Sequence, residues 1–314
     1  MKSILNNKNL LIVLIISGII ASCQSGQKDT DKAATEASKR SSFSKNDSLD
    51  SFDDIDEKSA LSSSPRDSLD EKNIQDLNPN DQTGTTRSEA VPGNLTKKLQ
   101  DAIKEKSEQQ IMKASGDILA GHPQDIFALN AMAMSHYRQN RMTMAKYFLN
   151  KAIKLNSQYA ELHSNLGLVL LADNEKRFAI QSFRRALQVN PRDPVASANL
   201  GAIYIVAKDY DKAAILLETA YKAGFKDYKT LTNYGISLAA QEKYPQALSM
   251  YQAALEQEQQ SQETMLNLAV LYIVHLKKMR EGQDVLNRLK FVETKPEWRT
   301  LIKDLEKRTQ VSLE

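Results

Sequence analysis

The sequence predicts an all-α protein, an α-solenoid of helix–turn–helix units that follows a long N-terminal tether. Three observations support this fold class. Residues 126–295 repeat with a period of 34 residues. Small and large apolar residues recur at helical spacing within each period, whereas residues 24–92 are dominated by Ser, Asp, Lys and Gln. A fixed period of this length is typical of paired helices that stack side by side.

Residues 1–22 have the features of a secretory signal peptide. Lys2 and Lys8 give a basic start, and the apolar run LLIVLIISGIIA at residues 10–21 follows. This run is about a dozen residues long, which is shorter than the roughly 20 needed to cross a bilayer. Small residues close it, as expected before a cleavage site.

Cys23 is the only cysteine in the chain, and it follows Ile20-Ala21-Ser22. This order resembles the lipobox of bacterial lipoproteins, in which cleavage leaves the cysteine as a new N-terminus that carries a diacylglycerol. The resemblance implies a lipid anchor in a bacterial cell envelope. Because Gln24 and not Asp follows the cysteine, it also implies the outer membrane, facing the periplasm. An ordinary signal peptide remains an alternative, as do the inner membrane and a cytosolic protein without a signal.

An acylated Cys23 would leave the chain without a thiol, which excludes disulfides, thiolate metal sites and cysteine nucleophiles. Residues 23–92 beyond it contain too few apolar residues to offset the entropy of ordering, so the sequence predicts a disordered linker. Residues 27–90 carry 9 Lys/Arg and 15 Asp/Glu, a net charge of 9 − 15 = −6. Residues 91–314 carry 31 and 24, a net charge of 31 − 24 = +7. The linker and the remainder are therefore oppositely charged.

The repeat itself is defined by columns of residues that recur every 34 positions. In the first helix of each unit a large apolar residue precedes a Gly or Ala, and in the second helix a large residue lies between two alanines. The first-helix columns are Leu166, Leu200, Tyr234 and Leu268, then Gly167, Gly201, Gly235 and Ala269. The second-helix columns are Ala145, Ala179, Ala213 and Ala247, then Leu149, Phe183, Leu217 and Tyr251, then Ala152, Ala186, Ala220 and Ala254. A small–large–small face of this kind is shaped to fit a neighbouring helix.

These columns resemble the tetratricopeptide repeat (TPR). The resemblance implies a right-handed superhelix of five units, with a degenerate leading hairpin at 93–125 and a capping helix at 296–314. The fifth unit fits with one residue inserted in its turn, since Gly282, Leu286 and Leu289 come one place late. The five units are residues 126–159, 160–193, 194–227, 228–261 and 262–295.

No catalytic motif is recognisable. The sequence has no Gly-rich phosphate loop, and the four histidines lack metal-ligand spacing; they are His122, His136, His163 and His275. No basic stripe with interleaved aromatic residues suggests a nucleic acid. We therefore expect a protein that is not an enzyme, with no cofactor and no bound metal.

The candidate binding surface is the concave groove that the first helices of such an array line. One column is an amide row of Asn165, Asn199, Asn233 and Asn267. Side-chain amides donate and accept, so the row could pair with the backbone of a bound peptide; alternatively, it braces the helices. Beside it lie aliphatic residues, which suit an apolar or amphipathic peptide. They include Leu168, Leu171, Ile205, Ile236, Val270 and Ile273. Lysine at Ile236 and Val270 is expected to abolish binding and leave the fold intact.

Three occupants of this groove remain open: a partner peptide, the chain's own C-terminal helix, and a second copy that would make a homo-oligomer. The function expected is a membrane-anchored scaffold or adaptor that binds other envelope proteins. An assembly factor for a pilus, secretion or gliding-motility machine is the first alternative. A cytosolic adaptor is the second.

Overall fold

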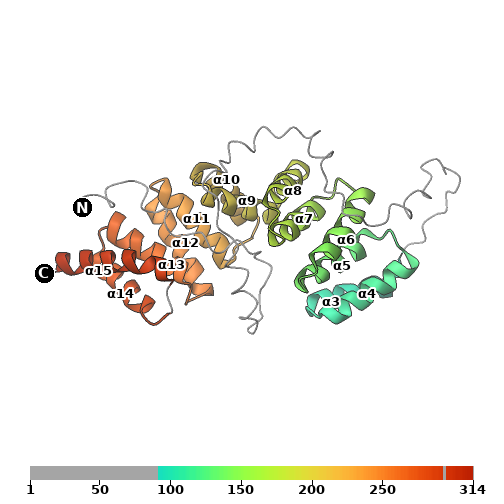
Figure 1. The fold of residues 1–314 in the computed structure, drawn as a ribbon, viewed down its shortest axis with the longest axis horizontal. Helices are drawn as coiled ribbons and strands as arrows, with labels where there is room; N and C mark the ends of the chain where they lie inside the picture. Colours follow the sequence, from blue (N-terminus) through green and yellow to red (C-terminus); the bar gives the residue numbers. More distant parts are fainter. Residues whose placement is uncertain (1–90, 293–294, 314) are drawn as a thin grey trace.

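The computed structural model describes residues 91–292 and 295–313, and within them the chain is helical with no strand. Figure 1 shows the helices in pairs that follow one another along the molecule. The pairs are α3 (Gly93–Lys104) with α4 (Glu108–Gly121), α5 (Ile126–Arg138) with α6 (Met142–Leu155), α7 (Ala160–Ala172) with α8 (Lys176–Val189), α9 (Pro194–Val206) with α10 (Tyr210–Lys222), α11 (Tyr228–Ala240) with α12 (Tyr244–Gln257), and α13 (Gln262–Val270) with α14 (Met279–Leu289). After η6 (Pro296–Trp298), α15 (Arg299–Leu313) closes the stack. The predicted all-α solenoid is confirmed, whereas the signal peptide, Cys23 and the linker lie outside the described residues.

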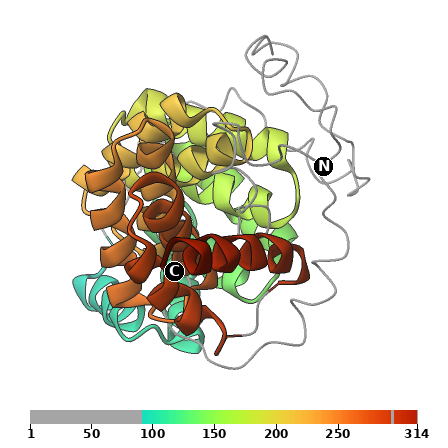
Figure 2. The ribbon, with the colours of Figure 1, turned by 90° about the vertical axis from the view of Figure 1, so that its left-hand side faces the viewer.

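Each first helix packs on the second helix of its own pair and, from α5 on, also on the second helix of the preceding pair. The helices α5, α7, α9, α11 and α13 begin at the residues where the predicted units begin. Figure 2 views the stack from its C-terminal end, with α15 crossing the front. A chain built in this way buries apolar residues mainly between neighbouring pairs, so every unit depends on the next.

Three glycines let the two helices of a pair touch. A Cβ atom at Gly167 would lie 2.5 Å from Phe183 Cε1, one at Gly201 2.7 Å from Leu217 Cγ, and one at Gly235 2.6 Å from Tyr251 Cε1. Real Cβ contacts are longer than this. Each glycine therefore makes room for the large residue of the second helix, as the columns of the sequence predict.

The turn inside each pair has the same backbone geometry. Asn140, Asn174, Lys208 and Glu242 recur every 34 residues with φ between 60° and 66°. The residue after each of them donates its N–H to a carbonyl five positions earlier, as in the bond from Lys243 N to Leu238 O of 2.9 Å. No glycine occupies this left-handed position, so the turn stores strain at each repeat.

The extra residue of the fifth unit does not lie in the turn, as the sequence suggested, but within the first helix. Residues Leu271–His275 form a π-helix, η5, that continues α13. Leu276 N donates to Leu271 O at 2.9 Å, and the left-handed residue Lys277 follows Glu242 by 35 positions. A single inserted residue is accommodated as one wide helical turn, in which Leu276 and Lys278 still donate to carbonyls of η5.

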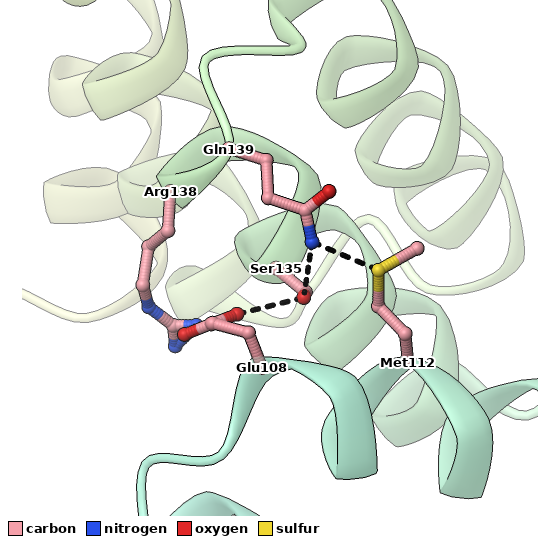
Figure 3. Close-up of polar contacts among 5 residues, drawn as sticks. All are labelled: Glu108, Met112, Ser135, Arg138 and Gln139. Atoms are coloured by element: carbon pink, nitrogen blue, oxygen red, sulfur yellow. Dashed lines mark hydrogen bonds and ion pairs between the residues drawn. The ribbon is translucent and has the colours of Figure 1, made fainter.

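The leading hairpin joins the first unit through a polar contact. Ser135 Oγ, fully buried on α5, donates to Glu108 Oε2 on α4 at 2.7 Å, and Arg138 Nη1 lies 3.2 Å from Glu108 Oε1. Figure 3 shows these residues between the two helices, with Gln139 Nε2 reaching Met112 Sδ. Glu108 is at the start of α4 and Arg138 at the end of α5, where each charge favours its helix dipole.

The C-terminal helix α15 packs on α14 and α13, where the first helix of a further unit would lie. Trp298 and Leu305 are buried in the same core cluster as the last units, and Lys290 pairs with Glu306 at 3.0 Å. The helix thus covers the end of the stack. Within the described part of the chain, no helix combines the length and apolar character needed to traverse a bilayer.

Candidate partner-binding surface

The first helices contact one another as well as their partners. The structure brings α5 against α7, α7 against α9, α9 against α11 and α11 against α13. Side chains that were predicted to line an open groove therefore lie at these contacts. This arrangement decides which residues a partner can reach.

The six aliphatic residues of the predicted groove are all buried. Their exposed fractions are 1% for Leu168, 8% for Leu171, 3% for Ile205, 1% for Ile236, 0% for Val270 and 1% for Ile273. All six belong to one core cluster. These side chains, which were predicted as peptide contacts, lie in the core of the stack, and Ile273 packs against α14 at Gly282.

The asparagine column also serves the stack. Asn165 Nδ2 donates to Asn130 Oδ1 on α5 at 2.9 Å, which links two units directly. Asn199 Nδ2 donates to Val195 O, and Asn267 Nδ2 to Glu263 O, each at 2.8 Å and each within one helix. Asn267 is fully buried, whereas Asn233 is half-buried. The bracing alternative thus describes Asn165, whereas Asn199 and Asn267 each bond to a carbonyl of their own helix.

Hydroxyl groups that the sequence reading missed complete this bracing. Ser164 Oγ donates to Asp193 Oδ1 at 2.8 Å, which joins α7 to the start of α9. The Thr232 and Thr264 hydroxyls lie 2.7 Å apart across α11 and α13. A signal was available, since Ser164, Ala198 and Thr232 share one repeat column of small residues beside the asparagines.

A second missed column holds the helix caps. Asp125, Asp193, Asp227 and Ser261 lie immediately before first helices, and each side chain accepts a hydrogen bond from a backbone N–H of the first turn. Such caps satisfy donors that have no partner within the helix. The remaining member of the column, Tyr159, makes no capping bond before α7. Helix capping therefore does not explain why a tyrosine occupies this position.

Tyr159 instead belongs to a partly exposed cluster at the N-terminal ends of α5 and α7. The Tyr159 hydroxyl donates to Glu161 Oε2 at 3.2 Å, and Asn130 Nδ2 donates to Glu161 Oε1 at 2.9 Å. Phe127 lies one helical turn before Asn130, and the Phe127 and Tyr159 residues are each 40% exposed. We call the exposed residues Phe127, Tyr159 and Glu161 the rim patch; Asn130, which holds Glu161, and Asn165, which holds Asn130, are buried.

The rim patch combines two aromatic rings with an exposed carboxylate. The negative charge of Glu161, burial and the hydrogen bond to Glu161 together raise the pKa of Tyr159, so the phenol stays protonated and remains a donor. Exposed aromatic residues beside polar groups are typical anchors of protein interfaces. In the residues that the structure describes, no group of three or more His, Cys, Asp or Glu side chains is placed to hold a metal ion.

Comparison with known proteins agrees with the paired-helix fold. A tetratricopeptide repeat family model matches residues 178–232 and 238–305. Among solved structures, one of pilF from Pseudomonas aeruginosa superposes with a TM-score of 0.55 at 19% identity, over 65% of this chain and 92% of that one. YrrB, described as a TPR protein with an unusual peptide-binding site, gives 0.50 at 19% identity, over 61% and 98%. At these identities the likeness concerns the fold alone.

Curated relatives are distant and longer. Anaphase-promoting complex subunit 7 of Dictyostelium discoideum is 25% identical over 187 residues, which are 59% of this chain and 32% of the relative. Tetratricopeptide repeat protein 8 of Caenorhabditis elegans is 25% identical over 170 residues, 52% of this chain and 33% of the relative. The chain thus spans about a third of each of these relatives.

The helix pairs, the 34-residue columns and these matches have one common explanation. The described helices have the fold of a tetratricopeptide repeat array, and residues 178–232 and 238–305 match the model of that family.

Proposed function

We propose that this chain is a non-catalytic scaffold of the bacterial cell envelope that binds a partner protein at the rim patch. The observation that carries the proposal is the exposed ring of Tyr159 bonded to the exposed carboxylate of Glu161; Phe127, also exposed, lies one helical turn before Asn130, which bonds the same carboxylate. The deeper columns are closed by packing between first helices. A partner segment with an apolar side chain and a cation or amide N–H fits the rim, because Glu161 accepts hydrogen bonds there.

The rim is tested by replacing its aromatic rings. Phe127→Ala together with Tyr159→Ala is expected to abolish capture of the partner after crosslinking in cells, with the thermal melting curve kept. Phe291→Ala is the matched control, because Phe291 is 92% exposed on the C-terminal side of the stack. Capture that survives the double variant and fails in the control would place the interface elsewhere.

Anchoring through Cys23 is the second part of the proposal. It is supported by the basic start, the apolar run and Ile20-Ala21-Ser22-Cys23 of the sequence. A fatty-acid probe fed to cells should label the wild type and leave Cys23→Ala unlabelled, with the variant lost from the membrane fraction. Equal labelling of both would remove the lipoprotein assignment and favour a cytosolic adaptor.

A narrower form of the proposal is an assembly factor for a pilus, secretion or gliding-motility machine. It uses the same rim patch and the same anchor. The identity of the captured partner separates it from a general scaffold.

A further inference from the structure

The second helices of the first two units differ from the others in charge. The helices α6 (MTMAKYFLNKAIKL) and α8 (KRFAIQSFRRALQV) contain Lys and Arg and no Asp or Glu. Each of the other described second helices, α4, α10, α12 and α14, contains at least one carboxylate. The outer surface of α6 and α8 is therefore positive where the rest of the stack is mixed.

Apolar side chains are exposed on the same two helices. Met144 is 42% exposed, Tyr147 58% and Phe178 38%. Lys146 on α6 joins the helices, since its Nζ lies 2.6 Å from Glu175 Oε1, the residue that precedes α8. Tyr147 is next to Lys146 in sequence, and Phe178 lies within a turn of Glu175. The exposed rings of α6 and α8 therefore come from adjoining ends of the two helices.

Lysine and arginine residues lie on the same faces of α6 and α8 as the exposed apolar side chains. Lys151 and Lys154 follow Tyr147 by four and seven residues, and Arg185 follows Phe178 by seven, spacings that keep one helix face. Arg185 Nη1 donates to the neutral Gln188 Oε1 at 3.1 Å. We call Met144, Tyr147, Lys151, Lys154, Phe178 and Arg185 the outer patch. It offers apolar contact and positive charge together.

A complementary segment exists in the same chain, outside the described residues. Residues 46–61, NDSLDSFDDIDEKSAL, contain six Asp/Glu and one Lys, a net charge of 1 − 6 = −5. Leu49, Phe52 and Ile55 are spaced by three residues within it. We propose that this acidic segment docks on the outer patch, with Phe52 and its apolar neighbours against Tyr147 and Phe178 and its carboxylates against Lys151, Lys154 and Arg185.

Covalent connection favours this occupant over a separate molecule. Residues 62–90 join the segment to the described stack, and a chain of that length reaches about 100 Å when extended. A connection that can span two sites brings them to an effective concentration on the order of millimolar. Weak contacts of the kind that exposed charges and rings provide then suffice for docking.

The test uses the full chain and a carbodiimide that joins carboxylates to lysine amines without a spacer. Mass spectrometry should find Lys151 and Lys154 joined to carboxylates between Asp47 and Glu57. Tyr147→Ala with Phe178→Ala should lower the yield of these crosslinks about tenfold, because both ring contacts are lost. Phe52→Ala with Asp53→Asn and Asp54→Asn should do the same.

Asp-Ser-Leu-Asp occurs at residues 47–50 of the segment and again at 67–70, where no aromatic residue is nearby, so residues 67–70 are the matched control. Asp67→Asn with Asp70→Asn should leave the crosslinks unchanged. Mixing isotope-labelled and unlabelled chains should give crosslinks within one chain only. The proposal is overturned by crosslinks spread equally over Lys222 and Lys243, by crosslinks between chains, or by an outer patch that becomes protected only when phosphatidylglycerol vesicles are added.

Discussion

At the scale of single residues, Gly282 shows how one inserted residue changes which side chain fits at a repeat position. In the other units this position is Ala145, Ala179, Ala213 and Ala247. The π-turn brings Ile273 into the space that a Cβ atom at Gly282 would occupy. Overpacking of this kind typically costs about 1–3 kcal/mol.

Gly282→Ala is therefore expected to lower the midpoint of urea unfolding, although alanine is the residue of the repeat. The control is Gly116→Ala in α4, where the nearest atom to a new Cβ lies 4.0 Å away. That change should stabilise the protein by about 0.5–1 kcal/mol, the helix preference of Ala over Gly. Equal midpoints for the two variants would contradict the packing at Ile273.

Glu242 illustrates the strain of the repeated turn. Its φ of 61° is in the left-handed region, which costs a residue with a Cβ atom roughly 1–2 kcal/mol. Glu242→Gly should raise the free energy of unfolding by about 1 kcal/mol. The neighbouring Gln241→Gly, at φ −86°, should lower it. A chemical denaturation series of both variants checks the sign.

Two histidines make stability depend on pH. Burial lowers the pKa of His136, with the nearby Arg141 adding to the effect, and burial followed by Lys277 lowers the pKa of His275. Below a pH of about 6.5 the unfolded chain binds more protons at these histidines than the folded chain does. The free energy of unfolding is therefore highest above that pH and decreases as the pH falls towards 5. His136→Phe with His275→Phe should flatten melting temperatures over this range, and an unchanged slope would contradict the assignment.

At the scale of helices, Tyr159 at the cap position before α7 allows the effect of a substitution on stability to be distinguished from its effect on binding. Tyr159→Ser would place a capping hydroxyl before α7, where the other first helices have Asp or Ser. A cap of this type stabilises by about 1 kcal/mol. If Tyr159 is kept for binding, the variant should melt higher and bind the partner less well, a pattern common at functional sites. A variant that melts lower would show that the ring serves packing.

The sequence predicted the helices well because the columns report contacts inside and between pairs. Gly167 facing Phe183 and Gly235 facing Tyr251 could be read from the period alone. The columns do not report how closely successive first helices approach. That distance decides whether Ile236 or Asn165 faces a ligand or a neighbour, and it depends on the summed geometry of many contacts. The columns consequently do not show that the six aliphatic residues are buried, whereas Tyr159 deviates from a capping pattern that the sequence does contain.

At the scale of the whole molecule, each helix pair contacts the pairs next to it, and additional contacts cover both ends of the described stack. Glu108, Ser135 and Arg138 attach the leading hairpin through polar groups, and Trp298 and Leu305 seal the other end with apolar ones. Because stability in such arrays is a sum over neighbouring units, damage to one interface should spread to both sides of it. The rim patch, where α5 and α7 begin, remains a surface that a partner can reach.

The most direct test compares two double variants for melting and for partner capture. Ile236→Lys with Val270→Lys buries two charges in the core, which costs several kcal/mol, so the account predicts a much lower melting temperature. Phe127→Ala with Tyr159→Ser should melt no lower than the wild type, because the new serine adds a cap, and should lose the partner. An Ile236→Lys, Val270→Lys protein that melts like the wild type and has lost only its partner would contradict the account.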